Sequence, residues 1–537
     1  MALAQDSYTI HVAARIEEYV DDRVTWQRSL WQLGTVLALR EVGEYADQLR
    51  RGAIKEEGLK FALQAAQAQC EKDLAVSSDS SAVRIKELLA SAKDLRSEYV
   101  AAQLGHLADR VEAGYLKRWA SAATAGSAVP SAERASRFIA SHMLDAELSP
   151  HAIRAWVREI HASSGSFDFV ALCNSADELI SEPAKKFKVI VPFRRFPDLT
   201  PAAKGSEERS LLVLDEAAAR ERLGDNAIEF QPSFGGALQL HVTARDPAAA
   251  VTYAQELLAR LLARLSVSPI HADSAELFDS AVVIGTHGVY PLSQQRRSVR
   301  LPSIDRSKSI LKVRPYAEAD ALDDALELLA YFEQGTPGAA LTGGWAALES
   351  LLVLPGEPDV LAADRLAAIV ACDFPRAELT WLAHARLDKS QTDQSVIDAV
   401  HPSSTVTERV QRLERALADG AAAMFVRPTD NAGLTRIRDL LANPADGLRK
   451  IHTSVTEALR RLYMQRNLVM HAGSLASVTR RATLRSAPTL ASAGVDRLVM
   501  AASFAGVTPL HLAARAETEL KLLPAGAPLQ PLGGLLM

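Results

Sequence analysis

One segment near the C-terminus combines residue types that could act on a phosphate group. Arg466, Asn467 and His471 stand in the order Arg-Asn-x-x-x-His, late in a long run of helical periodicity. Histidine is the natural proton shuttle near neutral pH, and a guanidinium can stabilise the charge of a phosphorane-like transition state. Because no carboxylate partner is evident in the segment, the three residue types suit an anionic, phosphate-bearing ligand.

The asparagine makes this segment distinctive. The chain has 13 histidines, so an Arg-x-x-x-x-His spacing is expected about once by chance. One such spacing joins Arg137 to His142, where the sequence predicts an ordinary amphipathic helix. Asparagine occurs five times in the chain. Requiring it directly after the arginine lowers the chance expectation to roughly 0.01.

A helix over this segment would bring the three side chains to one surface. At about 100° per residue, Asn467 and His471 lie on one face about one turn apart, and the long stem of Arg466 can swing its guanidinium toward them. Gly473 is predicted to end the helix as a C-cap. On spacing alone, His471 could instead be a capping histidine favoured by the helix dipole.

Common catalytic and metal-binding motifs are absent from the sequence. It lacks G-x-x-x-x-G-K-[ST], G-x-G-x-x-G and G-x-S-x-G, which disfavours P-loop, dinucleotide-binding and α/β-hydrolase enzymes. The three cysteines, Cys70, Cys173 and Cys372, are an odd number without metal-ligand spacing, so neither a disulfide scaffold nor a zinc site is expected. No metal ion and no cofactor is expected.

A basic run between residues 296 and 314 is a second candidate for contact with phosphate. The net charge of −5 makes no global case for nucleic-acid binding, so any such contact must come from a local patch. Seven basic residues face one acid, Asp305, in this run. The candidates for RNA contact are Arg296, Arg297, Arg300, Lys308 and Lys312, with Arg306 and Arg314 beside them. A solvated linker between domains is the alternative.

A second motif lies about 100 residues before the Arg-Asn-x-x-x-His segment. Trp345-Ala-Ala-Leu348-Glu349-Ser-Leu351-Leu352 is followed by Asp364-Arg365-Leu-Ala-Ala-Ile-Val. In this order and spacing, the motifs resemble those of ApeA-like domains of the HEPN superfamily. Such domains carry an aromatic-x-x-Leu-Glu-x-Leu-Leu helix, then an Arg-x-Ala helix, then Arg, a polar residue, three variable positions and His. The resemblance covers roughly residues 316–520.

The resemblance implies a metal-independent endoribonuclease. In that superfamily two HEPN domains pair, and their Arg/His sets face each other in a composite cleft. By carry-over, His471 would act on the 2′-hydroxyl or the leaving 5′-oxygen, Arg466 would stabilise the scissile phosphate and Asn467 would orient either one. Glu349 would hold Arg466 or His471 in place, with an ordinary surface carboxylate as the alternative. The products would be a 2′,3′-cyclic phosphate and a 5′-hydroxyl.

Family members of this kind are often toxic anti-phage effectors, which sets the expected partners. These are tRNA or other cellular or phage RNA as substrate, a second copy of the chain, and a phage-derived trigger. Two alternatives remain open. One is a non-catalytic HEPN-fold scaffold or dimerisation module, and the other is a ligand-sensing module that uses the middle domain.

The periodicity predicts a mainly α protein in three parts. These are a helical N-terminal region (1–160), a small α+β middle domain (161–315) and a HEPN-like helical domain (316–537) whose Pro/Gly-rich tail is mobile or docks. The last helix of the first part should start at Pro150 with Ser149 as N-cap. In the middle domain, helices are expected on one face of a sheet. The strands are expected at 167–173, 187–196, 210–215, 237–244 and 281–285, with a helix at 247–265.

Composition points to an ordinary globular protein. Hydrophobic residues make up 48% and charged residues 23% of the 537 residues, which excludes disorder of the whole chain. The first residues lack the basic and apolar pattern of a signal peptide. The longest uncharged apolar stretch, 498–514, is too short and broken to span a bilayer. A cytoplasmic protein without a membrane partner is therefore expected.

Overall fold

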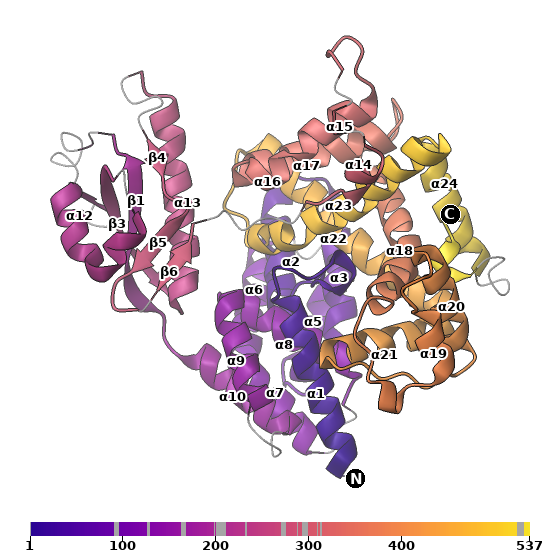
Figure 1. Cartoon of the computed structure of the whole chain (residues 1–537). Helices are drawn as coiled ribbons and strands as arrows, with labels where there is room; N and C mark the ends of the chain where they lie inside the picture. The colour runs from indigo at the N-terminus through magenta and orange to yellow at the C-terminus, as the bar shows by residue number, and fades with distance from the viewer. Residues whose placement is uncertain are drawn as a thin grey trace. The chain divides into compact units, whose positions relative to one another are not determined.

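The computed structural model describes most of the chain (Figure 1). The residues that it describes are 2–90, 96–125, 129–162, 168–197, 199, 211–230, 234–269, 275–286, 288–292, 299–308, 310–311, 314–523 and 531–536. Within them the chain is mainly helical, with one small antiparallel sheet in the middle, as the sequence predicts.

The elements follow one another in three stretches. The first stretch is helical: α1 (Ala2–Tyr19), η1 (Trp26–Arg28), α2 (Thr35–Arg50), α3 (Glu56–Cys70), α4 (Leu74–Ser77), α5 (Ala82–Leu89), α6 (Glu98–Glu112), α7 (Tyr115–Thr124), α8 (Ala132–Asp145), α9 (Pro150–Ala162) and α10 (Phe169–Ser181). The second holds the strands: β1 (Lys185–Arg195), β2 (Leu211–Leu214), α12 (Glu216–Leu223), η3 (Gly224–Phe230), β3 (Gly236–Ala244), α13 (Pro247–Ser266), β4 (Glu276–Leu277), β5 (Ser280–Val283) and β6 (Val289–Pro291). The third is helical again: α14 (Pro302–Arg306), α15 (Ala321–Leu329), α16 (Tyr331–Gln334), α17 (Pro337–Leu352), α18 (Leu361–Leu382), η4 (Lys389–Gln391), α19 (Gln394–Ala399), α20 (Val406–Ala418), α21 (Pro428–Ala442), α22 (Pro444–Ala472), α23 (Arg480–Ala505), α24 (Pro509–Leu522) and η6 (Leu532–Gly534).

These elements form two compact units. One unit, called the helical unit below, combines residues 1–145, 157–175 and 297–537, and the other, the sheet unit, combines 146–156 and 176–296. The sequence predicts the N-terminal and C-terminal helices as separate regions. The structure instead packs them together, because their buried faces cover each other: Trp31 belongs to the same core as the C-terminal helices.

In the sheet unit the strand order is β2-β3-β1-β5-β6, with β4 paired to β1 and all pairings antiparallel. Val189 and Val191 of β1 pack with α13, whereas Ile190 points to the opposite face, toward α12 and η3. This follows from the alternation of side chains along a strand. The expectation of helices on one face is therefore wrong, because both faces of the sheet carry apolar residues that need cover.

Four of the five predicted strands and the long helix α13 are confirmed. The strand expected at 167–173 is wrong, because its described part begins helix α10. Apolar residues recur at helical spacing from Ile16 to Leu37, which predicts an amphipathic helix, but the structure breaks this stretch: α1 ends at Tyr19 and α2 starts at Thr35. The predicted start of α9 is confirmed, since Ser149 Oγ accepts a hydrogen bond from the Ala152 amide at 3.1 Å.

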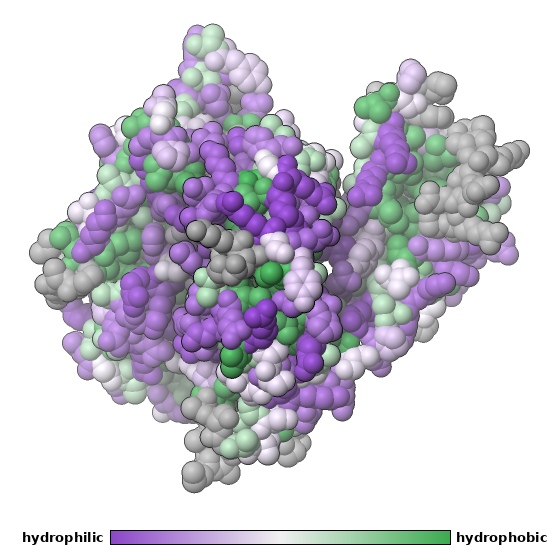
Figure 2. All heavy atoms as spheres, turned by 180° about the vertical axis from the view of Figure 1, so that it is seen from behind, coloured by the Kyte–Doolittle hydropathy of each residue, from purple (hydrophilic) through white to green (hydrophobic). Residues whose placement is uncertain are grey.

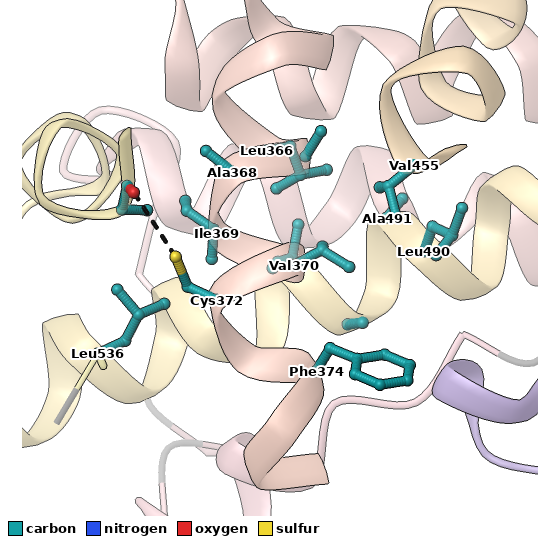
Figure 3. Packing of buried hydrophobic residues seen from close by; sticks show 14 of the residues in the cluster. Leu366, Ala368, Ile369, Val370, Cys372, Phe374, Val455, Leu490, Ala491 and Leu536 are labelled. Atoms are coloured by element: carbon teal, nitrogen blue, oxygen red, sulfur yellow. Dashed lines mark hydrogen bonds between the residues drawn. The ribbon is translucent and has the colours of Figure 1, made fainter. Parts of the chain in front are cut away.

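The core of the helical unit is built around α18. Leu366, Ile369 and Val370 of this helix are fully buried, next to Val455 of α22 and Leu490 of α23 (Figure 3). Close packing of this kind makes each methylene matter to stability. The Cys372 thiol, also buried, donates to the Ala516 carbonyl of α24 at 3.5 Å.

The end of the described chain docks onto this core. Glu414 of α20 accepts hydrogen bonds from the amides of Leu532 and Gly533 at 2.6 and 3.0 Å, and Leu535 and Leu536 are buried. Of the two alternatives predicted for the tail, a docking segment agrees with the contacts of residues 531–536. Residues 524–530 and 537 lie outside the described part.

The outside of the helical unit is largely polar. In the view of Figure 2 most of its side chains are hydrophilic, with smaller hydrophobic areas between them. Among the described residues, no helix taken singly has the length and apolar character needed to cross a membrane. Within this described part, the pair α23 and α24 reaches that length and composition together, and the two helices are bent by 111° relative to each other.

Candidate active site

The Arg-Asn-x-x-x-His segment occupies the last turns of α22, as predicted. Gly473 takes the left-handed conformation, with φ of 60°, and its amide donates to the Leu468 carbonyl. A residue with a Cβ is disfavoured there, which explains the glycine and confirms the predicted C-cap. The segment is therefore a regular helix end followed directly by the loop 473–479.

Two earlier helices hold α22 in place. Trp345 of α17 is fully buried, and its ring packs against Tyr463 of α22 with centroids 4.9 Å apart. Asp364, at the start of α18, accepts two hydrogen bonds from the guanidinium of Arg460, at 2.8 and 2.7 Å. Such a two-pronged pair fixes orientation as well as distance. The two motifs found in the sequence thus meet directly in the fold.

Arg365, next to Asp364, closes the turn between α17 and α18. Its guanidinium donates to the Leu352 carbonyl at 2.6 Å and makes an ion pair with Glu357, also at 2.6 Å. Through these contacts Arg365 secures the C-terminal end of α17, the helix that carries Glu349.

Three of the candidate side chains lie together. Arg466 Nη1 donates to Asn467 Oδ1 at 3.0 Å, and Arg466 Nη2 lies 3.7 Å from Glu349 Oε2. The same Glu349 oxygen accepts a 2.8 Å hydrogen bond from Trp345 Nε1. Arg466 and Glu349 are partly exposed, whereas Asn467 is buried. The guanidinium is thus oriented from two sides while one edge remains open to solvent.

His471 lies one turn further along α22 and is exposed. Within the described chain its imidazole makes no hydrogen bond or ion pair, so it is free to meet a ligand from outside. Asn467 and His471 are separated by ~6 Å along the helix axis. Met470, the preceding residue, and Leu475 and Val478 of the following loop are also exposed, at 60%, 37% and 44%.

Behind the candidate site, α22 is seated on the N-terminal helices. The Met464 side chain fills the space that Gly58 of α3 leaves open: a Cβ at residue 58 would lie 2.3 Å from Met464 Cε. Arg461 makes a fully buried ion pair with Glu41 of α2 at 2.8 Å. These two contacts set the depth and rotation of α22 below Arg466.

A chain of hydrogen bonds fixes the loop after His471. Gln465 Nε2 donates to Ser477 Oγ at 2.7 Å and to Thr479 Oγ1 at 3.0 Å, and Ser477 Oγ donates to Glu44 Oε2 of α2 at 2.8 Å. Burial raises the pKa of Glu44 to about 7. Sequence reasoning missed Gln465, Ser477 and Glu44. No short motif links them, because Glu44 is 433 positions from Ser477.

The basic run is only partly described and is not seen to join the site. Arg300 and Lys308 are exposed, and the backbone of Arg300 is hydrogen-bonded in both directions to Ser492 Oγ of α23. Arg314 pairs with Asp320 at 2.9 Å. Arg296, Arg297 and Lys312 lie outside the described residues.

No cluster of three or more His, Cys, Asp or Glu side chains that could hold a metal ion occurs in the part of the chain that the structure describes. Comparison with protein-family models, with curated proteins and with solved structures finds no match for this chain. The resemblance to HEPN domains therefore rests on the sequence motifs alone.

Proposed function

We propose that the chain is a metal-independent endoribonuclease of the HEPN type. The observation that carries the proposal is the arrangement at the end of α22, where Arg466 is oriented by Asn467 and Glu349 and the exposed His471 follows one turn later. A positioned cation and a free imidazole are the two groups that RNA transesterification needs.

In this proposal the 2′-oxygen of RNA attacks the adjacent phosphorus and the bond from phosphorus to the 5′-oxygen breaks. His471 takes the proton of the 2′-hydroxyl or supplies one to the leaving 5′-oxygen. Arg466 neutralises the charge that develops on the phosphoryl oxygens. The products are a 2′,3′-cyclic phosphate and a 5′-hydroxyl. One histidine per chain serves one of the two proton transfers, so a second copy of the chain would supply the other.

Pairing of two copies is supported by the apolar side chains around His471. Met470, Leu475 and Val478 are exposed at the end of α22 and in the loop that follows it, and exposed apolar residues that gather on one surface often mark a contact surface. We further propose that the protein acts in the bacterial cytoplasm as a toxic effector against phage, restrained until a phage-derived trigger appears. Its substrate would be tRNA or other cellular or phage RNA.

The test is cleavage of total tRNA by the purified chain in EDTA, with mapping of the product ends. Wild type should leave 2′,3′-cyclic phosphate ends, and His471→Ala should lower the rate at least 100-fold, a typical contribution of general acid–base catalysis. His511→Ala, which removes another exposed histidine of the helical unit, is the matched control and should cleave like wild type. Equal cleavage by His471→Ala would refute the proposal.

A non-catalytic scaffold is the second candidate, favoured by the same exposed apolar residues. It predicts that His471→Ala leaves the cellular phenotype unchanged, whereas Leu352→Asp, which puts a charge into the core beside α18, abolishes it. The nuclease proposal predicts that expression of wild type is toxic, at least once triggered, and that His471→Ala relieves the toxicity.

A further inference from the structure

A partly open cavity of about 540 Å³ lies in the helical unit, apart from the candidate active site. Its walls come from α1, α3, α8, α21 and the first half of α22. Pockets of roughly 300–1,000 Å³ are the usual size for small-molecule ligands. The cavity is thus large enough for a nucleotide-sized molecule.

Cations dominate the wall of this cavity. Seven basic side chains line it against two acids, Glu133 and Glu457. The seven are Arg15, Lys72, Arg134, Arg137, Arg436, Arg449 and Lys450. Since the whole chain carries a net charge of −5, this local excess of positive charge runs against the overall balance.

Four of these cations have an acidic partner; for Lys72, Arg134 and Arg137 the described residues supply none. Arg15 and Arg436 both pair with Glu133 at 2.9 Å, and Arg449 and Lys450 both contact Asp446. No hydrogen bond or ion pair holds the guanidinium of Arg134 or Arg137, as far as the described residues go. These two side chains stand one turn apart on α8, where both can reach the same ligand.

The surroundings of Arg137 disfavour its positive charge. Burial lowers the pKa of its guanidinium, and the positive charge of Arg134 lowers that pKa further, while Tyr19, Glu133 and Glu457 act against these effects. Arg137 is partly exposed, and a partly buried cation beside another cation is stabilised by an opposite charge. A phosphate group between Arg134 and Arg137 would supply that charge.

The cavity also presents polar atoms without partners and an apolar wall. Gln27 Oε1, Gln69 Oε1 and Arg436 Nε are buried and make no hydrogen bond within the described chain, although all three residues line the cavity. Gln27 is 3% exposed. Buried polar groups are normally satisfied, so free acceptors here indicate a place for ligand donors. Tyr19, Trp31, Phe138 and Phe374 form the aromatic part of the wall.

We propose that this cavity binds a nucleoside phosphate, with Arg134 and Arg137 holding the phosphates and the aromatic wall receiving the base. Free acceptor oxygens at Gln27 and Gln69 would take hydrogen bonds from amino or hydroxyl groups of the nucleoside. The site is separate from the one proposed for RNA cleavage: Glu457, the lining residue of α22 nearest to Arg466, is ~14 Å from it along the helix.

Isothermal titration of the full chain in EDTA tests this proposal. The probes are ATP, GTP, CTP and UTP. Tripolyphosphate, which has the phosphates without a nucleoside, and adenosine, which has the nucleoside without phosphates, are the comparison ligands. At least one nucleoside triphosphate should bind with one site per chain. Tripolyphosphate should bind at least tenfold more weakly, because it leaves the aromatic wall unused, and adenosine at least tenfold more weakly, because it lacks the anion.

Arg134→Gln and Arg137→Gln should each weaken nucleotide binding at least tenfold. Both should fold, because neither guanidinium makes a hydrogen bond or ion pair in the described structure, and Arg137 has only a contact with the Phe138 ring, 5.5 Å from its centroid. Circular dichroism checks the fold, and one folded variant of the two is enough for the test. Arg158→Gln, an exposed arginine of α9, is the matched control and should bind like wild type. Absence of saturable binding, binding unaffected by both cavity variants, or equally tight binding of adenosine or tripolyphosphate would overturn the proposal. Because the readout is binding, its failure is distinguishable from a failure of RNA cleavage.

Discussion

At the level of single residues, Glu44 connects the N-terminal helices to the loop beyond His471. Its carboxylate accepts the hydrogen bond from Ser477 Oγ, and burial raises its pKa to about 7, from an ordinary value of 4.5. Between these two values the folded protein holds a proton that the unfolded chain releases. Linkage then requires the free energy of unfolding to fall as the pH rises from about 4.5 to about 7.

Glu44→Gln should remove this part of the pH dependence, because the amide can still accept the Ser477 hydrogen bond but does not titrate. Urea unfolding of wild type and variant between pH 4.5 and pH 7.5 measures the difference, with Glu71→Gln, which replaces an exposed glutamate at the end of α3, as control. The gap between the Glu44→Gln and wild-type curves should widen toward neutral pH in favour of the variant. Parallel curves would contradict the assignment.

The pair of Glu349 and Arg466 should matter for chemistry more than for stability. The two side chains are 31% and 23% exposed and 3.7 Å apart, and partly exposed ion pairs contribute about 0–1 kcal/mol. Glu349→Gln should therefore change the free energy of unfolding by less than about 1 kcal/mol while lowering RNA cleavage about tenfold, because Arg466 loses one of its two anchors. Urea unfolding and the tRNA assay measure both quantities. A large loss of stability with unchanged cleavage would contradict this role.

The candidate site also shows what single-residue patterns can predict. Arg466, Asn467 and Glu349 come together as the spacing and the upstream motif indicate. The asparagine was informative because it is rare in this chain. The cations of the internal cavity gave no such signal, since Arg134 and Arg436 come from segments about 300 positions apart. Arg137, found by its spacing to His142, was assigned to an ordinary helix.

At the level of elements, the close approach of α16 and α17 depends on a glycine. A Cβ at Gly344 would lie 2.0 Å from the Phe332 ring. Phe332 and Trp345 are both fully buried, so the ring has little room to move. The space at Gly344 thus accommodates the Phe332 ring, and this contact helps to position α17, the helix that carries Glu349.

Gly344→Ala should destabilise the helical unit by about 1–3 kcal/mol, the usual cost of overpacking. Gly105→Ala, in the middle of α6 where nothing lies within 4 Å of the new Cβ, should be neutral or stabilising by up to about 1 kcal/mol, because alanine favours the helix. Thermal unfolding compares the two. Equal effects would mean that Phe332 can move aside.

At long apolar patterns the sequence predicts correctly whether a segment is a helix or a strand. At short ones it leaves the choice between the two open. The helix α13 and strands β1 and β3 follow from clear periods. The prediction of a strand at 167–173 is wrong because a short apolar run fits a strand or a buried helix equally well. The run over 16–37 kept its helical spacing across the break between α1 and α2, where buried Arg28 needs an irregular segment to reach its partners.

At the level of the whole molecule, buried charges join the two ends of the chain within the helical unit. The Arg28 guanidinium, 1% exposed, pairs with Glu18 at 2.9 Å, with Glu378 of α18 at 2.7 Å and with Asp430 of α21 at 3.0 Å. Two of these partners lie 350 and 402 positions away in the sequence. The sequence therefore suggested separate N-terminal and C-terminal regions, because no local pattern reveals a pairing over that distance.

Arg28→Ala should destabilise the helical unit by about 3–5 kcal/mol, since it leaves three buried carboxylates without their shared cation. Arg84→Ala is the control: its pair with Glu87 is more than half exposed, so the cost should stay below about 1 kcal/mol. Urea unfolding followed by tryptophan fluorescence and by circular dichroism measures both effects. In wild type the two probes should report one transition for the helical unit, because the N-terminal and C-terminal helices share a core. If Arg28→Ala instead left the C-terminal helices at their wild-type stability, the two ends of the chain would be independent, as the sequence alone suggested.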